Sequence, residues 1–424
     1  MSRTTAQLAL HGGTPVRTEP LLPGYPGGLL IGAEEKAAVL EVLDSQSLFR
    51  HYGPKPLGKA VEFERAFARA MGARHAVGVT SGTAALMTAL AALGVGPGDE
   101  VVVPTYTWIA TINAVVVLGA VPVFVDIDES LTMDPRAAEA AVTPATKALL
   151  PVHMRGAAAD IGALVEIARR RGLRLVEDAA QAVGGRYRGR RLGTFGDLGA
   201  FSLQYHKVIT TGEGGMVVTD DAALYDRAVR YHDQGSARME ELDETLPAGN
   251  PLMIGLNFRM SEITGAIGLV QLGRMEGIID RMRAHKRAIL DGLGGIAGLA
   301  PRPLPDPEGD TGATLMFFLP SAEATRAFST ALNAEGIRNT VAWDSGQHVY
   351  YHFDQIVERR LFSERHCAWE CPRYHGRARL EKGMFPRSDD LLKRAIHIDL
   401  HPLMTERDEA DIVRAIRKVA HALA

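Results

Sequence analysis

The chain contains very little cysteine. Only Cys367 and Cys371 occur among 424 residues, which excludes a scaffold held together by disulfides. Their Cys-x-x-x-Cys spacing, with His366 and His375 close by, could begin a zinc site. Structural zinc uses four well-spaced ligands, however, and no second cysteine pair follows. We therefore expect two reduced thiols and no metal.

A charge excess and a long apolar run are also missing. The 47 basic and 50 acidic residues give a net charge of −3, which argues against nucleic acid or a membrane as the main partner. The longest apolar stretch, residues 109–125, is interrupted by Asn113, Gly119 and Pro122. It falls short of the roughly 20 residues of a spanning helix, and the first residues carry no signal-peptide pattern. We expect a cytoplasmic protein.

The rest of the composition is that of an ordinary globular protein. Hydrophobic residues make up 46% and charged residues 23%, and this length predicts two or three domains. The 44 glycines show no Gly-X-Y period, so they are expected in tight turns and at close backbone approaches.

Short β-branched runs alternate with helical patterns over the first two thirds of the chain. Strands are predicted at residues 101–103, 121–125, 148–152, 173–176, 199–202 and 216–219. Helices are predicted at residues 84–93, 135–141, 160–171 and 222–231. This alternation is typical of an α/β fold with a mostly parallel sheet, which binds ligands at the carboxyl ends of its strands.

The composition changes after about residue 275. We divide the chain into an extended N-terminal segment (1–30), a large α/β domain (31–275) and a smaller α+β domain (276–424). The last domain is predicted to contain a strand at 314–319 and helices at 275–293, 322–335 and 406–423. The segment 341–390, rich in His, Tyr and Trp, has no assignment.

Residues 177–215 carry the densest chemical signal. Asp178 follows a buried strand, where a carboxylate is costly unless it meets a cation, although it could simply cap a helix. Ser202 ends another strand and could reach a phosphate or be satisfied locally. Lys207 has apolar and aromatic neighbours, and desolvation would lower its pKa and make it a better nucleophile. A lone loop lysine is otherwise a solvated charge.

Two more loops follow strands of the same domain. Ser81, Gly82 and Thr83 open a helix, whose free N–H groups can hold an anion, although Ser and Thr are also common helix caps. No Walker loop or G-x-G-x-x-G is present. Trp108, in the loop 104–111, offers a flat face or packs in the core. Phosphate donors, an aromatic face, a carboxylate and a desolvated lysine together suit pyridoxal phosphate.

The motifs in these loops resemble those of the DegT/DnrJ/EryC1/StrS family of pyridoxal-phosphate aminotransferases. The resemblance runs from about residue 8 to the C-terminus and is most specific in SGTAAL, PTYTWIAT, EDAAQAVG, FSLQYHKVITTGEGG and GLNFRMSE. It implies the fold of aspartate aminotransferase, fold type I, and a homodimer with active sites at the subunit interface.

The resemblance also implies roles for single residues. Lys207 matches the Schiff-base lysine, and Asp178 matches the partner of the pyridine nitrogen. Gln181 matches a residue near the ring hydroxyl, and Trp108 takes the place of the aromatic that stacks on the ring. Some relatives with His in place of the lysine are sugar dehydratases, so the retained Lys207 favours transamination.

Four further positions concern the phosphate. Gly82 and Thr83 match the phosphate loop, and Ser202 adds a hydroxyl. Asn257 matches an Asn that reaches the phosphate of the neighbouring subunit's cofactor. Asn257 could equally be a turn residue, and its neighbours Arg259 and Glu262 could form an interface ion pair.

The resemblance implies a ping-pong transfer of an amino group from L-glutamate or L-glutamine to a carbohydrate-derived carbonyl. Parts of the chain are similar to inosose aminotransferases and others to the 8-amino-3,8-dideoxy-octulosonate subgroup. An acid acceptor would need a cationic clamp, for which Arg50, Arg155, Arg259 and His348 are candidates. A pyridoxal-phosphate dehydratase or isomerase and a non-catalytic regulatory homologue are the alternatives.

Overall fold

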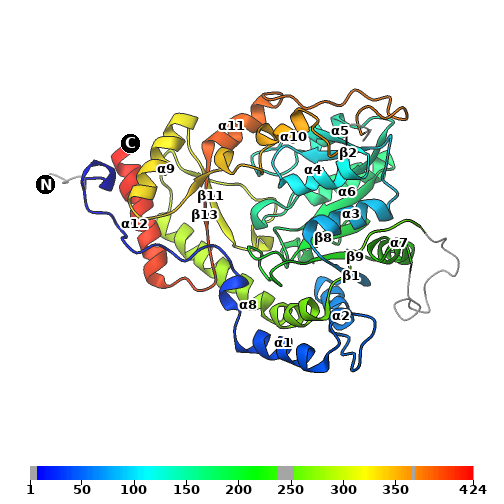
Figure 1. Cartoon of the computed structure of the whole chain (residues 1–424). Coiled ribbons are helices and arrows are strands. Elements are labelled where there is room, and N and C mark those ends of the chain that lie inside the picture. The colour runs from blue at the N-terminus through cyan, green and yellow to red at the C-terminus, as the bar shows by residue number, and fades with distance from the viewer. Residues whose placement is uncertain (1–6, 237–252, 364–367, 424) are drawn as a thin grey trace.

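A seven-stranded sheet forms the centre of the larger part of the molecule. The computed structural model describes residues 7–236, 253–363 and 368–423. The strands lie in the order β1-β9-β8-β5-β4-β2-β3, and Figure 1 labels β1, β9, β8 and β2 among them. Their bounds are His75–Val79 (β1), Glu100–Pro104 (β2), Val121–Val125 (β3), Thr146–Leu149 (β4), Arg174–Asp178 (β5), Leu198–Ser202 (β8) and Gly215–Thr219 (β9).

The sheet is mixed but mostly parallel, as predicted. Neighbouring strands from β3 to β8 pair in parallel, whereas β9 is antiparallel to both β8 and β1. The carboxyl ends of the parallel strands therefore meet at one edge. In the pairing of β5 with β8, Asp178 lies opposite Ala200, two residues before the end of β8 at Ser202.

Helices cover both faces of this sheet, because successive side chains of a strand point to opposite faces. Val101 and Val103 of β2 share an apolar cluster with helices α3, α4 and α7. Val102 shares another with α5 and α6, and β8 and β9 share a third with α2 and α8. These helices are α2 (Lys59–Met71), α3 (Gly82–Ala92), α4 (Ile109–Val117), α5 (Pro135–Ala140), α6 (Ile161–Arg171), α7 (Ala222–His232) and α8 (Glu262–Leu293).

The C-terminal part is built on a separate antiparallel sheet of order β10-β11-β13-β12, which confirms its α+β class. Its strands are β10 (Ala300–Pro301), β11 (Thr314–Phe318), β12 (Thr340–Val341) and β13 (Ala395–Asp399). The helices α9 (Ala322–Ala334), α11 (Pro386–Arg394) and α12 (Glu406–Leu423) pack on it. The N-terminal segment runs beside α9 and α12 (Figure 1), where Lys418 Nζ donates to Thr14 O.

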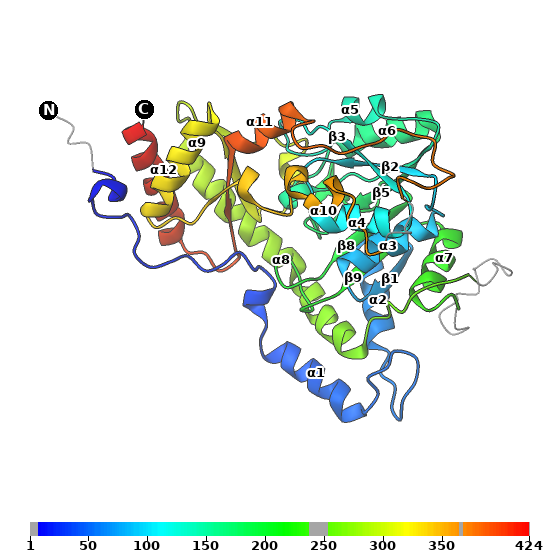
Figure 2. The same ribbon diagram turned by 45° about the horizontal axis from the view of Figure 1, so that its top comes forward.

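Helix α8 joins the two parts (Figure 2). Near its start Gly265 and Gly268 lie against Ala60 and Phe63 of α2, and near its end Gly292 lies against Val413 of α12. The helix predicted from residue 275 therefore begins earlier, at Glu262. The division of the chain into 1–30, 31–275 and 276–424 stays a proposal, with one boundary inside this helix.

Other predictions also need correction. The strand predicted at 148–152 is β4, shifted toward the N-terminus, and residues 109–111 of the predicted loop 104–111 begin α4. No helix or strand was predicted for residues 31–74, where α1 (Ala33–Ser45) and α2 lie. The described part of 341–390 contains only short elements: β12, three-residue 3-10 helices at Ala342–Asp344 and Tyr350–His352, α10 (Asp354–Val357) and the start of α11. Among the described helices, none has the length and apolar character needed to span a membrane.

Candidate active site

Asp178 ends β5 at the carboxyl edge of the sheet, where it is almost fully buried. Its Oδ2 accepts a hydrogen bond of 2.8 Å from Thr111 Oγ1, and its Oδ1 accepts one of 3.0 Å from the Ala180 N–H. The N–H of His153 donates to the Asp178 carbonyl at 3.0 Å, which ties the loop after β4 to the same point. Asp178 is therefore a fixed carboxylate and not an exposed helix cap.

Lys207 lies in the loop that connects β8 to β9. Its N–H donates to Gln204 O at 2.9 Å, and its carbonyl accepts from the Gly27 N–H at 3.2 Å. The preceding residue, His206, stacks on Tyr25 with ring centroids 4.5 Å apart. The N-terminal segment and the start of the loop thus hold the Lys207 backbone in place.

Burial and charge act together on these two groups. Burial lowers the pKa of Lys207 to about 8, opposed by the attraction of Asp178 and reinforced by the charge of Arg155. Burial raises the pKa of Asp178, opposed by the hydrogen bonds from Thr111 and Ala180 and by the charge of Lys207. The lysine and the carboxylate are therefore close enough for each charge to shift the pKa of the other.

Gly82, Thr83 and Ser202 form a second group, at the N-terminus of α3. The Oγ of Ser81 caps this helix by accepting from the Ala84 N–H at 3.1 Å. A Cβ atom on Gly82 would lie 2.7 Å from Ser202 Cβ, so a glycine is required for this approach. Free N–H groups at the start of α3 and the Ser202 hydroxyl are thus brought together, as an anion site requires.

Gln181 contacts the loop after β4, and Trp108 immediately precedes helix α4. Gln181 Oε1 accepts a 3.1 Å hydrogen bond from the Arg155 N–H. Trp108 is 46% exposed, so core packing does not account for it. Its ring lies 4.8 Å from that of His348, centroid to centroid. A flat face is therefore available beside the site.

Asn257 lies apart from the residues above. It is exposed, pairs with Asp233 in an isolated bridge, and accepts from the Arg259 N–H at 3.4 Å. None of the hydrogen bonds in the described ranges joins it to Lys207 or Asp178.

Two of the candidate clamp residues already donate hydrogen bonds to carboxylates. Arg50 forms a bidentate pair with Glu64, with distances of 3.0 and 2.9 Å. Arg259 pairs with Asp233. Arg155 and His348 remain, and burial lowers the pKa of His348 to about 3, so this imidazole is neutral. Arg155 is the candidate that retains a charge beside the site.

The sequence analysis missed Thr111 and His153. Thr111 lies one turn after Trp108, inside the motif PTYTWIAT, and this spacing could have suggested a side chain on the same face. His153 Nδ1 accepts from the Ala159 N–H at 3.1 Å, so Nε2 carries the proton and donates to Glu177 Oε2 at 2.9 Å. Glu177 also accepts from the N–H groups of Gly193 and Gly196, each at 2.8 Å. It anchors the loop before β8.

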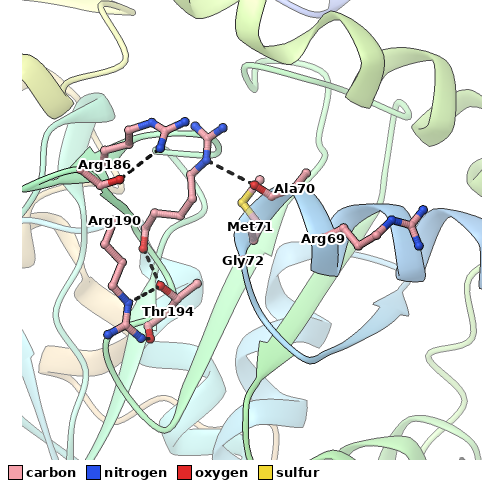
Figure 3. Close-up of a pocket in the computed structure, with 9 residues that line it drawn as sticks. Arg69, Ala70, Met71, Gly72, Arg186, Arg190 and Thr194 are labelled. Carbon is pink, nitrogen blue, oxygen red and sulfur yellow. Dashed lines mark hydrogen bonds between the residues drawn. The ribbon is translucent and has the colours of Figure 1, made fainter.

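A polar pocket of about 270 Å³ lies elsewhere, between residues 69–72 and 186–194 (Figure 3). Arg186, Arg190 and Arg191 in this pocket donate to protein oxygens; Arg190 Nε, for example, donates to Thr194 Oγ1 at 3.0 Å. The side chain of Arg69 points away from the others (Figure 3). None of the candidate site residues lines this pocket.

No cluster of three or more His, Cys, Asp or Glu side chains suited to a metal occurs in the part of the chain that the structure describes. Cys367 and His366 lie outside the described residues, so the zinc alternative is not tested there. Cys371 is buried as a free thiol.

Comparison with known proteins gives consistent results. The DegT/DnrJ/EryC1/StrS aminotransferase family matches residues 30–365. The L-glutamine:2-deoxy-scyllo-inosose aminotransferase of Micromonospora echinospora is 38% identical over 426 residues, which is 97% of each chain. GDP-perosamine synthase of Caulobacter vibrioides is 41% identical over 261 residues, 61% of this chain and 66% of the relative.

Solved structures agree with this result. The structure of 3-amino-5-hydroxybenzoic acid synthase is similar with a TM-score of 0.78 at 30% identity, over 96% of this chain and 100% of that one. Fold and sequence together define a pyridoxal-phosphate-dependent transaminase of fold type I. The chain belongs to the DegT/DnrJ/EryC1/StrS aminotransferase family.

The residues present fit the cofactor. Asp178 is a buried carboxylate whose pKa is raised by burial, so a cationic ring nitrogen beside it would supply a missing partner. Lys207 has a lowered pKa, as an amine that attacks an aldehyde requires. The start of α3 offers N–H groups to a phosphate. The close approach of Gly82 to Ser202 places the Ser202 hydroxyl beside these groups.

Proposed function

We propose that the enzyme transfers the amino group of L-glutamine or L-glutamate to the carbonyl carbon of a carbohydrate-derived acceptor. The observation that carries this proposal is the juxtaposition of Lys207 and Asp178 at the carboxyl edge of the sheet. The names of the relatives support the substrates, since that of the Micromonospora echinospora relative contains L-glutamine and an inosose.

We assign the cofactor contacts as follows. Asp178 would pair with the pyridine nitrogen, Gln181 would lie near the ring hydroxyl, and Trp108 would stack on the ring. Gly82, Thr83 and Ser202 would hold the phosphate. Support comes from the burial of Asp178, the exposed face of Trp108 and the free N–H groups at the start of α3.

Lys207 would both hold the cofactor covalently and move a proton. When bound, the cofactor supplies an electron sink that stabilises negative charge at the substrate carbon. Lys207 Nζ, once displaced by the donor amine, would take the proton from that carbon as a general base. Asp178, fixed by Thr111 and Ala180, would keep the ring nitrogen charged through both half-reactions.

The lowered pKa of Lys207 predicts how cofactor attachment depends on pH. With a pKa of about 8, about a tenth of Lys207 is neutral at pH 7, against roughly one in three thousand for an ordinary lysine. The rate of covalent attachment to the apoenzyme, followed by absorbance, should therefore rise with pH and level off above about 8. Glu213→Gln should move this midpoint down, because the Glu213 charge raises the pKa of Lys207. A midpoint near the ordinary value of 10.5 would contradict the assignment.

We propose a homodimer with shared active sites. The segment 253–262 and the loop 48–52 pack together, since the Glu262 N–H donates to Leu48 O at 3.2 Å. Together they expose Leu48, Tyr52, Ile254 and Leu256, of which Ile254 is 93% exposed. Exposed apolar side chains on neighbouring segments are typical of an interface, and Asn257 lies on the same segment as Ile254 and Leu256. Light scattering of the holoenzyme should give twice the mass of 45.7 kDa.

We also propose that the enzyme acts in the cytoplasm, since it has two cysteines and Cys371 is a buried free thiol.

The acceptor can be identified with the enzyme in its aminated form. Holoenzyme treated with L-glutamine or L-glutamate should lose the yellow absorption of the lysine-bound cofactor. Inososes, nucleotide keto-sugars and 8-oxo-octulosonate would then be added singly, and the acceptor is the compound that restores the absorption in one turnover. An enzyme that loses its absorption with neither amino acid, or releases ammonia and no aminated product, would support an elimination reaction instead.

A further inference from the structure

Arg155 lies directly beside the candidate active site. It is the middle residue of the 3-10 turn Met154–Gly156, in the loop that follows β4. Its N–H donates to Gln181 Oε1 at 3.1 Å, and the neighbouring loop residue His153 is hydrogen-bonded to the backbone of Asp178. These hydrogen bonds tie the loop of Arg155 to Gln181 and to the backbone of Asp178, two residues assigned to the cofactor ring.

Arg155 has an unusual backbone conformation. Its φ of 57° and ψ of 38° lie in the left-handed region, which a glycine adopts freely and a residue with a side chain adopts at a cost. Strained residues of this kind cluster at functional sites. This conformation, in a residue hydrogen-bonded to Gln181, makes the Arg155 side chain a candidate for a role at the edge of the sheet.

The guanidinium of Arg155 is incompletely paired among the described residues. Its Nη1 forms a long ion pair with Asp399 Oδ1 at 3.6 Å, which is beyond hydrogen-bond range, and the Asp399 side chain is 45% exposed. Its Nε is buried without a hydrogen-bond partner. A second carboxylate could bind Nε and a terminal nitrogen side by side, which is the geometry that arginine favours.

The surroundings of Arg155 also lack negative charge. Besides Lys207, its charge acts on two imidazoles, those of His348 and His397, and lowers the pKa of each. The His397 imidazole is buried and that of His348 is half-buried, and both are neutral, so they add no anion. Tyr106 and Asp399 are the acidic groups that act on Arg155 from the described residues, and of the two only Asp399 is a carboxylate. An incoming anion is therefore favoured at this point.

We propose that Arg155 binds the α-carboxylate of the amino donor through paired hydrogen bonds from its guanidinium. The inference rests on the proposed function, because it requires an amino-acid donor. In such a donor the carboxylate is attached to the same carbon as the amino group. When that nitrogen reaches the position of Lys207 Nζ, the carboxylate lies close by and needs a cation with free donors. Arg155 meets this requirement, whereas Arg50 and Arg259 are occupied by Glu64 and Asp233.

The test compares two donors that differ only at the α-carboxylate. L-glutamate and L-isoglutamine, its α-amide, are reacted with wild-type holoenzyme and with Arg155→Gln, and loss of cofactor absorption gives the rate of the first half-reaction. Wild type should prefer L-glutamate by roughly 10–100-fold in kcat/KM, the usual value of charge-assisted hydrogen bonds. Arg155→Gln should lose this preference, and Arg155→Lys should keep part of it. An unchanged cofactor absorption would show that the variants are folded and loaded.

Arg188→Gln is the matched control, because Arg188 is also an arginine in the left-handed region, with a φ of 49°, but lies exposed on the β6–β7 hairpin (Arg186–Tyr187 and Arg190–Arg191). It should behave as wild type. A preference for L-glutamate retained in Arg155→Gln, or a loss confined to the acceptor half-reaction, would overturn the proposal.

Calorimetry with glutarate, which lacks the amino group, gives an independent answer: binding should weaken roughly tenfold or more in Arg155→Gln alone. If wild type binds glutarate but deaminates neither amino acid, the proposed donor is wrong and the anion site of Arg155 stands.

Discussion

Lys207→Ala is expected to abolish amine transfer and the yellow absorption of the holoenzyme. One side chain is proposed both to attach the cofactor and to move the proton at the substrate carbon, so kcat should fall at least about 10⁴-fold. The variant should still fold, because removing a partly buried ammonium whose pKa is lowered by burial relieves an unfavourable desolvation. The measurements are the absorption spectrum of the reconstituted protein and the single-turnover rate with L-glutamine.

Lys382→Ala is a suitable control for this substitution. Lys382 is 42% exposed and pairs with Asp354 at the surface at 2.6 Å, so its removal should change neither spectrum nor rate. A Lys207→Ala variant that kept the absorption band would assign the covalent attachment to another lysine. A colourless wild type after reconstitution would refute the whole assignment of the site.

The positions of three candidate site residues near strand ends could be predicted from the sequence. Asp178, Ser202 and Lys207 follow short, strongly apolar strands, and parallel pairing brings such ends to one edge of a sheet. The partners of these side chains were not predictable in the same way. Thr111 reaches Asp178 across 67 positions of sequence, and a contact of this kind depends on tertiary packing.

Helix α8 shows why the remaining elements were harder to predict. Its first half contains Gly265, Gly268, Gly273 and Gly277, and glycine lowers helix propensity. Yet a Cβ atom on Gly265 would lie 2.5 Å from Ala60 N, and one on Gly268 would lie 2.5 Å from the Phe63 ring. Close packing on α2 therefore requires glycine at these two positions. Because glycine is a poor helix former, the local sequence pattern did not predict this part of the helix.

Asp178→Asn is the second substitution with a large expected effect, because it removes a charge and little else. Two groups donate to the carboxylate, the Thr111 hydroxyl and the Ala180 N–H. In the variant the amide oxygen can keep the bond from Ala180, and the amide NH₂ can donate to the Thr111 hydroxyl, which also accepts. The thermal stability of the apoenzyme should therefore be retained or rise, since burial already raises the pKa of Asp178 and disfavours its charge.

The rate should behave differently from the stability. Without the carboxylate the ring nitrogen would no longer be held in its charged form, and the half-reaction with L-glutamine should slow by roughly 10²–10³-fold, as when one preorganised electrostatic contact is lost. Thr111→Val is the comparison, because it removes one hydrogen bond from Asp178 and leaves the charge, so a loss of roughly tenfold is expected. If Asp178→Asn were as fast as Thr111→Val, the charge of Asp178 would have no role in the reaction. Its contribution to the rate would then come from hydrogen bonding alone. Stopped-flow absorbance on the two variants and wild type separates these outcomes.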